Sequence, residues 1–251
     1  MPPLPEEKYL KRYGIVNVHS AGPPNRLGFK YFTGKHLASG QRVFIKTDPS
    51  AGQAAAREAA LLKILNAQPH ATCFPRLVTH KPRGKDAFVA TGFITGISLD
   101  RFLDQQPQLT TGQTRRLLNQ LTRILTILQM NKIIHRDIRP PNFMVQMKKE
   151  KPSLFLIDFS FAVALKPHSL PELPFLLANQ WFLERLGGRY RAARDHWDDA
   201  LSCHKLARRL AANYQTKYPQ IWSTIHSAIG QLTFSASAPK TEQDAKKQTD
   251  P

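Results

Sequence analysis

The chain has 251 residues, 41% hydrophobic and 22% charged, so it can bury a core of ordinary size, which excludes disordered and fibrous proteins. Its formal net charge of +18 favours an anionic partner such as nucleotide phosphates, a nucleic acid, an acidic glycan or a membrane surface. The two cysteines, Cys73 and Cys203, lie far apart, which argues against a disulfide scaffold or a cysteine zinc site and favours a reducing compartment.

The amino-terminal part is predicted to be rich in strands. β-Branched and aromatic residues recur in segments 13–20, 26–37 and 41–47, and small turn residues at 38–40 indicate a hairpin between the last two. From about residue 51 to 67 the apolar residues recur at helical spacing instead. The sequence therefore predicts a strand meander followed by one helix.

The middle of the chain alternates between strand and helix patterns. A strand pair is expected over 77–81 and 86–93, and a long amphipathic helix over 111–130, where leucines and isoleucines form one apolar stripe. Two short apolar strands are expected next, over 142–147 and 153–159.

The remaining part of the chain is predicted to be mainly helical. Helices are expected over 195–212 and 218–233, and the polar segment that follows has the composition of a disordered tail. The domain organisation predicted from these patterns is an amino-terminal extension over 1–12, a β-rich lobe over 13–94, a shortened helical lobe over 95–234 and a disordered polar tail over 235–251.

The most specific motif is the segment IIHRDIRPPNFMV, which fits H-R-D-x-x-x-x-N with Asp137 and Asn142 as the aspartate and the asparagine. Asp158 follows in LFLIDFS, at the end of an apolar strand, and Lys46 precedes both on the strand VFIK. These motifs, in this order, resemble the eukaryotic-like protein kinase family over about residues 13–212. The resemblance implies an α+β, bilobal protein-kinase-like fold with a β-rich amino-terminal lobe and a shortened helical carboxy-terminal lobe.

The resemblance also implies a role for each charged residue in phosphoryl transfer from ATP, which depends mainly on positioning and on neutralising phosphate charge. Lys46 would hold the α and β phosphates, and Asn142 and Asp158 would supply oxygen ligands for Mg²⁺. Asp137 would accept the proton of the attacking hydroxyl, and Arg139 would contact the γ-phosphate.

Glu58 lies on the apolar face of the helix predicted over 51–67, and a carboxylate on a buried face needs a cation. Lys46 is the candidate, as in the strand-to-helix ion pair of the family. The alternative is a solvent-facing glutamate paired with Arg57 or Lys63 on the same helix.

The segment VATGFITGISLDRFL resembles the kinase hinge, with Thr91 as gatekeeper and Gly92 to Ile94 presenting backbone to the adenine edge. The phosphate-covering segment, NVHSAGPPNRLGF, offers Gly22 but no G-x-G-x-x-G, and its two prolines have no N–H for a phosphate. The nucleotide is therefore expected to be held mainly by Lys46 and the metal.

The segment LGGRYRAARDHWDDALSCHKL resembles the end of the activation segment, and Asp199 with Ser202 matches D-x-x-S, whose aspartate would brace the catalytic loop. Three positions depart from the family pattern. Ser160 replaces the glycine of D-F-G, which limits backbone freedom there. Gly187 and Arg194 replace a threonine and the glutamate of A-P-E, which weakens the case for a peptide substrate.

Regulation by phosphorylation is not expected from this sequence. In the family the arginine at Arg136 often pairs with a phosphorylated activation loop. Between Phe159 and Ser202 the hydroxyl residues are Ser160, Ser169 and Tyr190, and there is no threonine. Constitutive activity is therefore predicted.

Three functions remain open. The first is an ATP- and Mg²⁺-dependent kinase acting on serine or threonine, and the second is a sugar kinase of the same fold, because the chain also resembles the compact bacterial lipopolysaccharide core kinases. Guanidinium groups suit an anionic acceptor, although such a cluster can equally be a solvated face. The cluster in question consists of Arg185, Arg189, Arg191 and Arg194. The third function is a pseudokinase scaffold, which only the missing glycine loop supports.

The expected partners are ATP and a protein or anionic glycan acceptor. Nucleic-acid binding ranks lower, because no aromatic-interleaved basic motif is present. No secretory signal and no run of ~18 apolar residues is visible, so we expect no transmembrane segment and a cytoplasmic protein. Its charge permits peripheral contact with the inner face of a membrane.

Overall fold

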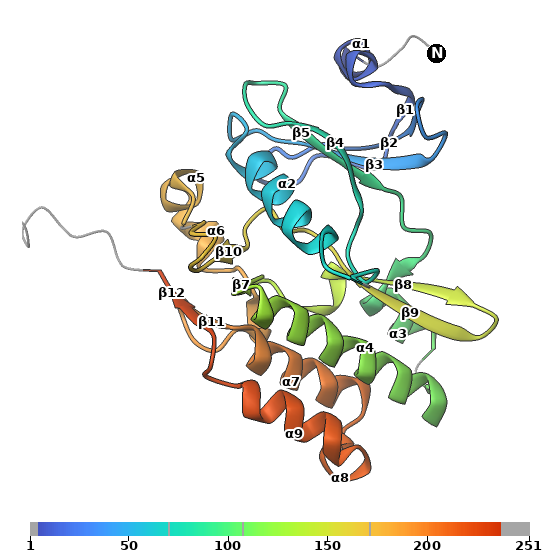
Figure 1. Cartoon of the computed structure of the whole chain (residues 1–251), viewed down its shortest axis with the longest axis vertical. Coiled ribbons are helices and arrows are strands. Elements are labelled where there is room, and N and C mark those ends of the chain that lie inside the picture. The colour runs from blue at the N-terminus through green and yellow to red at the C-terminus, as the bar shows by residue number, and fades with distance from the viewer. Residues whose placement is uncertain (1–4, 70, 107, 171, 237–251) are drawn as a thin grey trace, which may run out of the picture.

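The computed structural model describes residues 5–69, 71–106, 108–170 and 172–236, which form two lobes (Figure 1). The amino-terminal lobe is built on a five-stranded antiparallel sheet in the order β1-β2-β3-β5-β4, as the sequence predicts for this part of the chain. Its strands are β1 (Ile15–Ser20), β2 (Tyr31–His36), β3 (Arg42–Thr47), β4 (Leu77–Lys81) and β5 (Phe88–Gly92).

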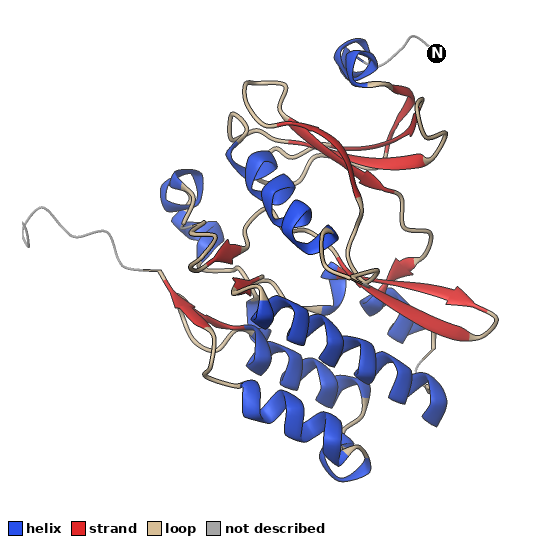
Figure 2. Ribbon diagram, viewed as in Figure 1, coloured by secondary structure: helices blue, strands red, loops and turns tan. Residues whose placement is uncertain are grey.

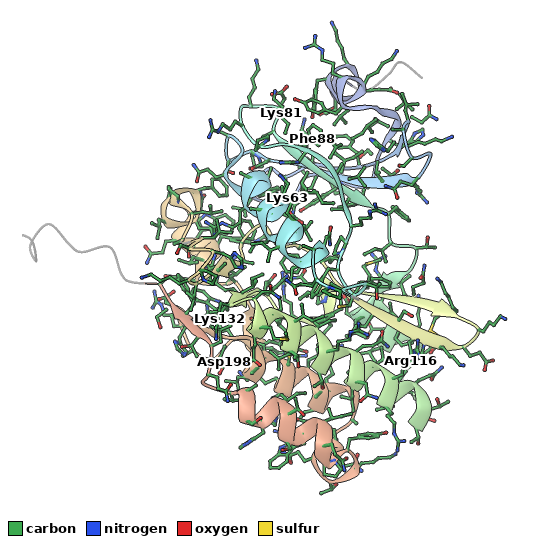
Figure 3. All side chains as sticks on the ribbon, viewed as in Figure 1. Lys63, Lys81, Phe88, Arg116, Lys132 and Asp198 are labelled. Atoms are coloured by element: carbon green, nitrogen blue, oxygen red, sulfur yellow. The ribbon has the colours of Figure 1, made fainter. Side chains whose placement is uncertain are left out.

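Helix α2 (Gln53–Asn66) is the helix predicted over 51–67, and most of its alanines and leucines are buried. Of the segment predicted as an amino-terminal extension, residues 5–12 fold onto the sheet through α1 (Pro5–Leu10) and a 3-10 turn over Lys11–Tyr13, and residues 1–4 lie outside the described residues. Leu10 is fully buried, and the ring of Tyr13 meets the ring of Phe88, labelled in Figure 3, edge-on at a centroid distance of 5.0 Å. Through Leu10, Tyr9 and Tyr13 this segment therefore packs against the core of the amino-terminal lobe.

Three helices lying side by side dominate the carboxy-terminal lobe (Figures 1 and 2). They are α4 (Thr111–Met130), α7 (Asp199–Leu210) and α9 (Pro219–Ala228). Helix α4 has the predicted bounds, and Thr110 begins it with a reciprocal capping box to Gln113. Its apolar stripe is buried as predicted, and consists of Leu117, Leu118, Leu121, Ile124, Leu125 and Leu128.

Short strands hold the loops that face the amino-terminal lobe. One small sheet has the order β6-β8-β9, and a second pairs β10 with β7. The segment between β7 and β8 is the one that contains the H-R-D motif, so it is fixed at both ends. The elements of this region are β6 (Ile97–Ser98), α3 (Leu99–Gln105), β7 (Ile133–Ile134), a 3-10 turn (Pro140–Asn142), β8 (Phe143–Lys148), β9 (Lys151–Leu156) and β10 (Val163–Ala164).

The helix predicted over 195–212 is shorter than expected at its start. A strand, β11 (His196–Asp198), comes first, and the Asp198 carboxylate then caps α7 by accepting the N–H groups of Ala200 and Leu201 (Figure 3). Before β11 the chain forms three short helical turns, namely α5 (Pro174–Ala178), α6 (Gln180–Leu183) and a 3-10 turn (Gly188–Tyr190).

The helix predicted over 218–233 is also wrong in its extent. A short α8 (Tyr214–Lys217) precedes α9, which ends at Ala228, and Gly230 then takes a positive φ of 79° that turns the chain back. Residues Thr233–Ser235 form β12, which pairs antiparallel with β11. Ser235, predicted to begin a disordered tail, is thus in a strand, and the rest of that predicted tail, from residue 237, lies outside the described residues.

No helix within the described ranges is long and apolar enough to cross a membrane.

Candidate active site

A cavity of about 270 Å³ opens between the two lobes. Val89 and Thr91 of β5 line it from the amino-terminal lobe, and Met144 of β8 and Ile157 line it from the carboxy-terminal lobe. Its lining is mostly apolar, and Lys46, Glu58 and Asp158 form its charged inner part. An apolar pocket with a few convergent charges is the usual form of a small-molecule site.

Two of the predicted nucleotide contacts, Gly92 and Ile94, line this cavity together with Thr91. Gly22 lies on the exposed connection between β1 and β2 and does not line it. Tyr31 and Phe44 also line the cavity, and they were not predicted from the sequence; their rings stack on each other with centroids 6.0 Å apart. The available signal was strand alternation, because Phe44 lies two residues before Lys46 and so shares its face of β3.

Lys46 is paired with two carboxylates at the inner end of the cavity. Its Nζ lies 2.8 Å from Glu58 Oε2 and 2.6 Å from Asp158 Oδ1. The Lys46 and Glu58 side chains are 8% and 6% exposed. Burial alone would lower the pKa of Lys46, but the charges of Asp158 and Glu58 outweigh burial, and the net pKa is raised. The ammonium therefore stays charged at neutral pH.

The position of Glu58 decides between the two pairings considered from the sequence. Its partner is Lys46, as the buried face of α2 predicts, whereas Arg57 points to the carboxy-terminal lobe and donates to the Ala162 carbonyl at 2.9 Å. The Glu58 carboxylate also accepts the hydroxyl of Ser160 at 2.7 Å, a contact that the sequence reasoning missed.

The Asp137 carboxylate is held from three sides. It accepts the backbone N–H of Gly187 at 2.7 Å and the Arg139 guanidinium at 2.9 Å, and the Asn142 amide donates to its Oδ2. Gly187 has a positive φ of 82°, and a Cβ there would lie 2.8 Å from the Arg136 carbonyl oxygen. Glycine at this departure from the family pattern thus lets the backbone reach Asp137.

Asp199 braces the catalytic loop in the way the resemblance implies. Its carboxylate accepts the backbone N–H groups of His135 and Arg136, the second at 3.1 Å. Burial raises the pKa of Asp199 to about 7, and these two hydrogen bonds act in the opposite direction. The Ser202 hydroxyl donates to the Tyr190 carbonyl at 2.9 Å, so both residues of D-x-x-S tie loops together.

Arg136 is paired with Glu172, a residue that the sequence reasoning did not single out. The guanidinium contacts both Glu172 oxygens, one of them at 3.1 Å, and its Nε donates to the Phe161 carbonyl at 2.7 Å. The sequence offered one signal, because Glu172 is the only acidic residue between Asp158 and Glu184. The anion that meets Arg136 is therefore a carboxylate of the chain itself.

The side-chain oxygens of Asp158 and Asn142 suit a hard cation. Burial alone would raise the pKa of Asp158, but the charge and hydrogen bond of Lys46 outweigh burial and the net pKa is lowered, so the carboxylate is ionised. Asp158 is 34% exposed, and the Asn142 amide nitrogen is turned to Asp137, which leaves its oxygen for a ligand. Backbone bonding of Ile157 N–H to the Asn142 carbonyl at 2.9 Å holds the two donors near each other.

Two protein donors suit Mg²⁺, which can take its remaining ligands from phosphate and water, better than they suit a metal ion that is bound by protein side chains alone. Mg²⁺ prefers oxygen ligands and is usually bound through one or two carboxylates together with substrate phosphates. Over the ranges that the structure describes, no group of three or more histidine, cysteine, aspartate or glutamate side chains could hold a metal ion.

The four clustered arginines are not equivalent. Arg194 pairs with Glu184, and Arg191 donates to the Glu184 carbonyl, so both are tied to the α6 end. Arg185 and Arg189 are exposed, and each lies over an aromatic ring, at 5.8 and 5.4 Å from the centroid.

Comparison with known proteins agrees with this geometry. A family model described as "Protein kinase domain" matches residues 30–242. The chain is 25% identical over 197 residues to "Serine/threonine-protein kinase ATG1a" of Arabidopsis thaliana, which covers 73% of this chain and 30% of that protein. It is 32% identical over 109 residues to "Serine/threonine-protein kinase ULK3" of Homo sapiens, covering 42% and 22%.

The chain is also similar to a serine/threonine-protein kinase of Nostoc sp.. "Serine/threonine-protein kinase PknA" of Nostoc sp. is 32% identical over 103 residues, which covers 41% of this chain and 18% of that protein. The chain thus matches less than a third of the length of each of these relatives. The matched family segment contains all the charged residues of the cavity and of the catalytic loop, and the chain therefore belongs to the protein kinase domain family.

Proposed function

We propose that the protein transfers the γ-phosphate of ATP, together with Mg²⁺, to a serine or threonine hydroxyl of a protein. The observation that carries this proposal is the buried set of ion pairs from Lys46 to Glu58 and Asp158, next to the catalytic loop with Asp137. The three relatives named above are all serine/threonine-protein kinases, which supports the choice of acceptor.

The cavity would hold the nucleoside of ATP. Tyr31 and Phe44 offer ring faces on one side and Met144 offers an apolar contact on the other, while Gly92 and Ile94 bring backbone to its edge. An aromatic face stacks favourably on a purine. The charged Lys46 ammonium lies deeper in the same cavity, where it would meet the α and β phosphates.

Asn142 and Asp158 would hold Mg²⁺, which when bound neutralises the charge that develops on the phosphoryl oxygens. Asp137 would accept the proton of the attacking hydroxyl. The Gly187 N–H and Arg139 fix the direction of its carboxylate, and Arg139, 42% exposed, would also reach the γ-phosphate.

Activity without activation-loop phosphorylation is part of this proposal. Glu172 already supplies the negative charge that Arg136 would otherwise gain from a phosphate. We expect phosphatase treatment, with the phosphatase removed before the assay, to leave the rate of transfer unchanged. Glu172→Gln should lower that rate, and Glu150→Gln, an exposed control, should not. A rate that falls after phosphatase treatment would show that a phosphate is needed.

The test of the function is γ-labelled ATP with Mg²⁺, offered in parallel to generic protein substrates and to dephosphorylated lipopolysaccharide. Label that survives on serine or threonine after acid hydrolysis of the protein supports a protein kinase. Label on the glycan alone would replace the proposed acceptor with a sugar hydroxyl, and label on neither would remove the proposed activity.

The second acceptor, an anionic glycan, is favoured by one observation, the exposed guanidinium groups of Arg185 and Arg189. If they bind an anionic acceptor, Arg185→Glu with Arg189→Glu should raise the KM for that acceptor about severalfold and weaken its dependence on salt. The KM for ATP should stay unchanged. These two residues are a better choice than Arg191 and Arg194, whose ties to Glu184 make their replacement a structural change.

The control for this double variant reverses two charges on the turn between β4 and β5, with Arg83→Glu and Lys85→Glu. Both residues are exposed, and the net change in charge is the same. Equal effects of the two double variants would show that the clustered arginines act only through net charge, and the glycan reading would lose its support.

A further inference from the structure

Ser160 is a fully buried serine directly after the D-F pair of the metal-binding segment. Its hydroxyl donates to Glu58 Oε2 at 2.7 Å, and its backbone N–H hydrogen-bonds the Asp158 carboxylate. One residue is thus tied to both carboxylates that pair with Lys46. The backbone contact is open to any residue except proline, but the hydroxyl contact requires the serine side chain.

The hydroxyl strengthens a contact that is already buried and charged. Glu58 Oε2 is the same oxygen that accepts Lys46 Nζ at 2.8 Å, so this oxygen has two donors from different parts of the chain. A hydrogen bond to an ionised acceptor is stronger than one between neutral groups. Removing a donor from a buried carboxylate also costs more free energy than removing one from an exposed carboxylate, because water cannot replace it.

This contact also joins two elements that belong to different lobes. Glu58 is on α2 and Ser160 is on the segment that follows β9, and Figure 1 shows α2 at the junction of the lobes. The neighbouring residue of α2, Arg57, donates to the Ala162 carbonyl of the same segment at 2.9 Å. Adjacent side chains of α2 therefore hold two residues of one short segment.

We propose that Ser160 is a positioning residue of the phosphotransfer reaction, whose hydroxyl holds Glu58 and α2 in the position that keeps Lys46 directed into the cavity. The proposal rests on the proposed function for its kinetic consequence, but the position of α2 is a property of the protein alone. Without the hydroxyl, outward movement of α2 breaks one strong contact fewer, and Lys46 is correctly placed in a smaller fraction of molecules.

The first test compares Ser160→Ala and Ser160→Gly with the wild type. Both variants remove the hydroxyl, and glycine also adds backbone freedom. We expect kcat/KM to fall about tenfold in both, which is the scale of a hydrogen bond to a charged acceptor. Ser169→Ala, an exposed serine of the same segment, is the control and should leave kcat/KM unchanged. Wild-type kcat/KM in Ser160→Ala would overturn the proposal, and so would a fall confined to Ser160→Gly.

A double-mutant cycle separates positioning from a general structural role. If Ser160 acts through Glu58, Ser160→Ala should cost nothing further in a Glu58→Ala background. If it merely fills space, the same fold-loss should appear in both backgrounds, and that additivity would contradict the proposal.

Hydrogen exchange of the α2 amides supplies a readout that does not depend on catalysis. Ser160→Ala should speed exchange in α2, whose Glu58 accepts the Ser160 hydroxyl. Exchange in α4, which this hydrogen bond does not involve, should stay the same. Unchanged exchange in α2 would overturn the proposal even in an active enzyme. If the wild type transfers no phosphate but α2 loosens in the variant, the proposed function fails and the structural claim stands.

Discussion

Asp137→Ala is expected to slow phosphate transfer by ~10²–10⁴-fold, the usual contribution of a general base, while the affinity for ATP stays nearly unchanged. Asp137 does not line the cavity, and its carboxylate contacts Gly187, Arg139 and Asn142. Its loss should therefore remove the proton acceptor without removing a nucleotide contact. Single-turnover rates and calorimetric binding of ATP measure the two effects separately.

The control for this variant is Asp104→Ala, which removes an exposed carboxylate at the end of α3 and should leave both quantities unchanged. Asp137→Asn keeps the shape and some of the contacts of the side chain, so it should be as slow as the alanine variant if the proton is what matters. A rate near that of the wild type in Asp137→Asn would exclude the general-base role.

Asp158→Ala is expected to abolish transfer and also the dependence of nucleotide affinity on Mg²⁺. The carboxylate is ionised and one-third exposed at the charged end of the cavity, so it is the strongest metal ligand that the site offers. Lys46 keeps Glu58 as a partner in this variant, so the charged end should not collapse. In contrast to Asp137→Ala, this variant should lose the Mg²⁺-dependent part of nucleotide binding as well as the chemistry.

The measurement is the dissociation constant of ATP with Mg²⁺ and with a chelator, for wild type and variant. In the wild type Mg²⁺ should tighten binding by about tenfold or more, and in Asp158→Ala it should have no effect. If Asp137→Ala and Asp158→Ala lose ATP affinity equally, the assignment of base and metal ligand to these two aspartates is wrong.

Local patterns predicted the long elements of the fold because each of these elements carries its own signal. The apolar stripe of α4 lies at helical spacing over its whole length, and its bounds followed directly. The strand pair β11 and β12 could not be found in this way, because three-residue strands carry little alternation and pair across more than thirty positions of sequence. The sequence around Asp198 has several acidic residues, and none of them alone indicates where α7 begins.

Some contacts of the site could be predicted from the sequence and others could not. The ion pair of Lys46 with Glu58 could be predicted, because a carboxylate on a buried helix face requires a cation. The Gly187 N–H on Asp137 could not, because every residue except proline carries a backbone donor and the sequence does not say which one reaches a carboxylate. The clustered arginines show the third case, since their charge was visible in the sequence but their division between Glu184 and solvent was not.

The most direct test of the proposed phosphotransfer is transfer of label from γ-labelled ATP to a hydroxyl acceptor, measured in single turnover with Mg²⁺ and with a chelator. We expect transfer by the wild type that requires Mg²⁺, and transfer by Asp137→Asn that is slower by ~10²-fold or more at saturating ATP. Wild-type protein that binds ATP but transfers no label to protein or glycan, with Mg²⁺ present, would contradict the account and leave a nucleotide-binding scaffold.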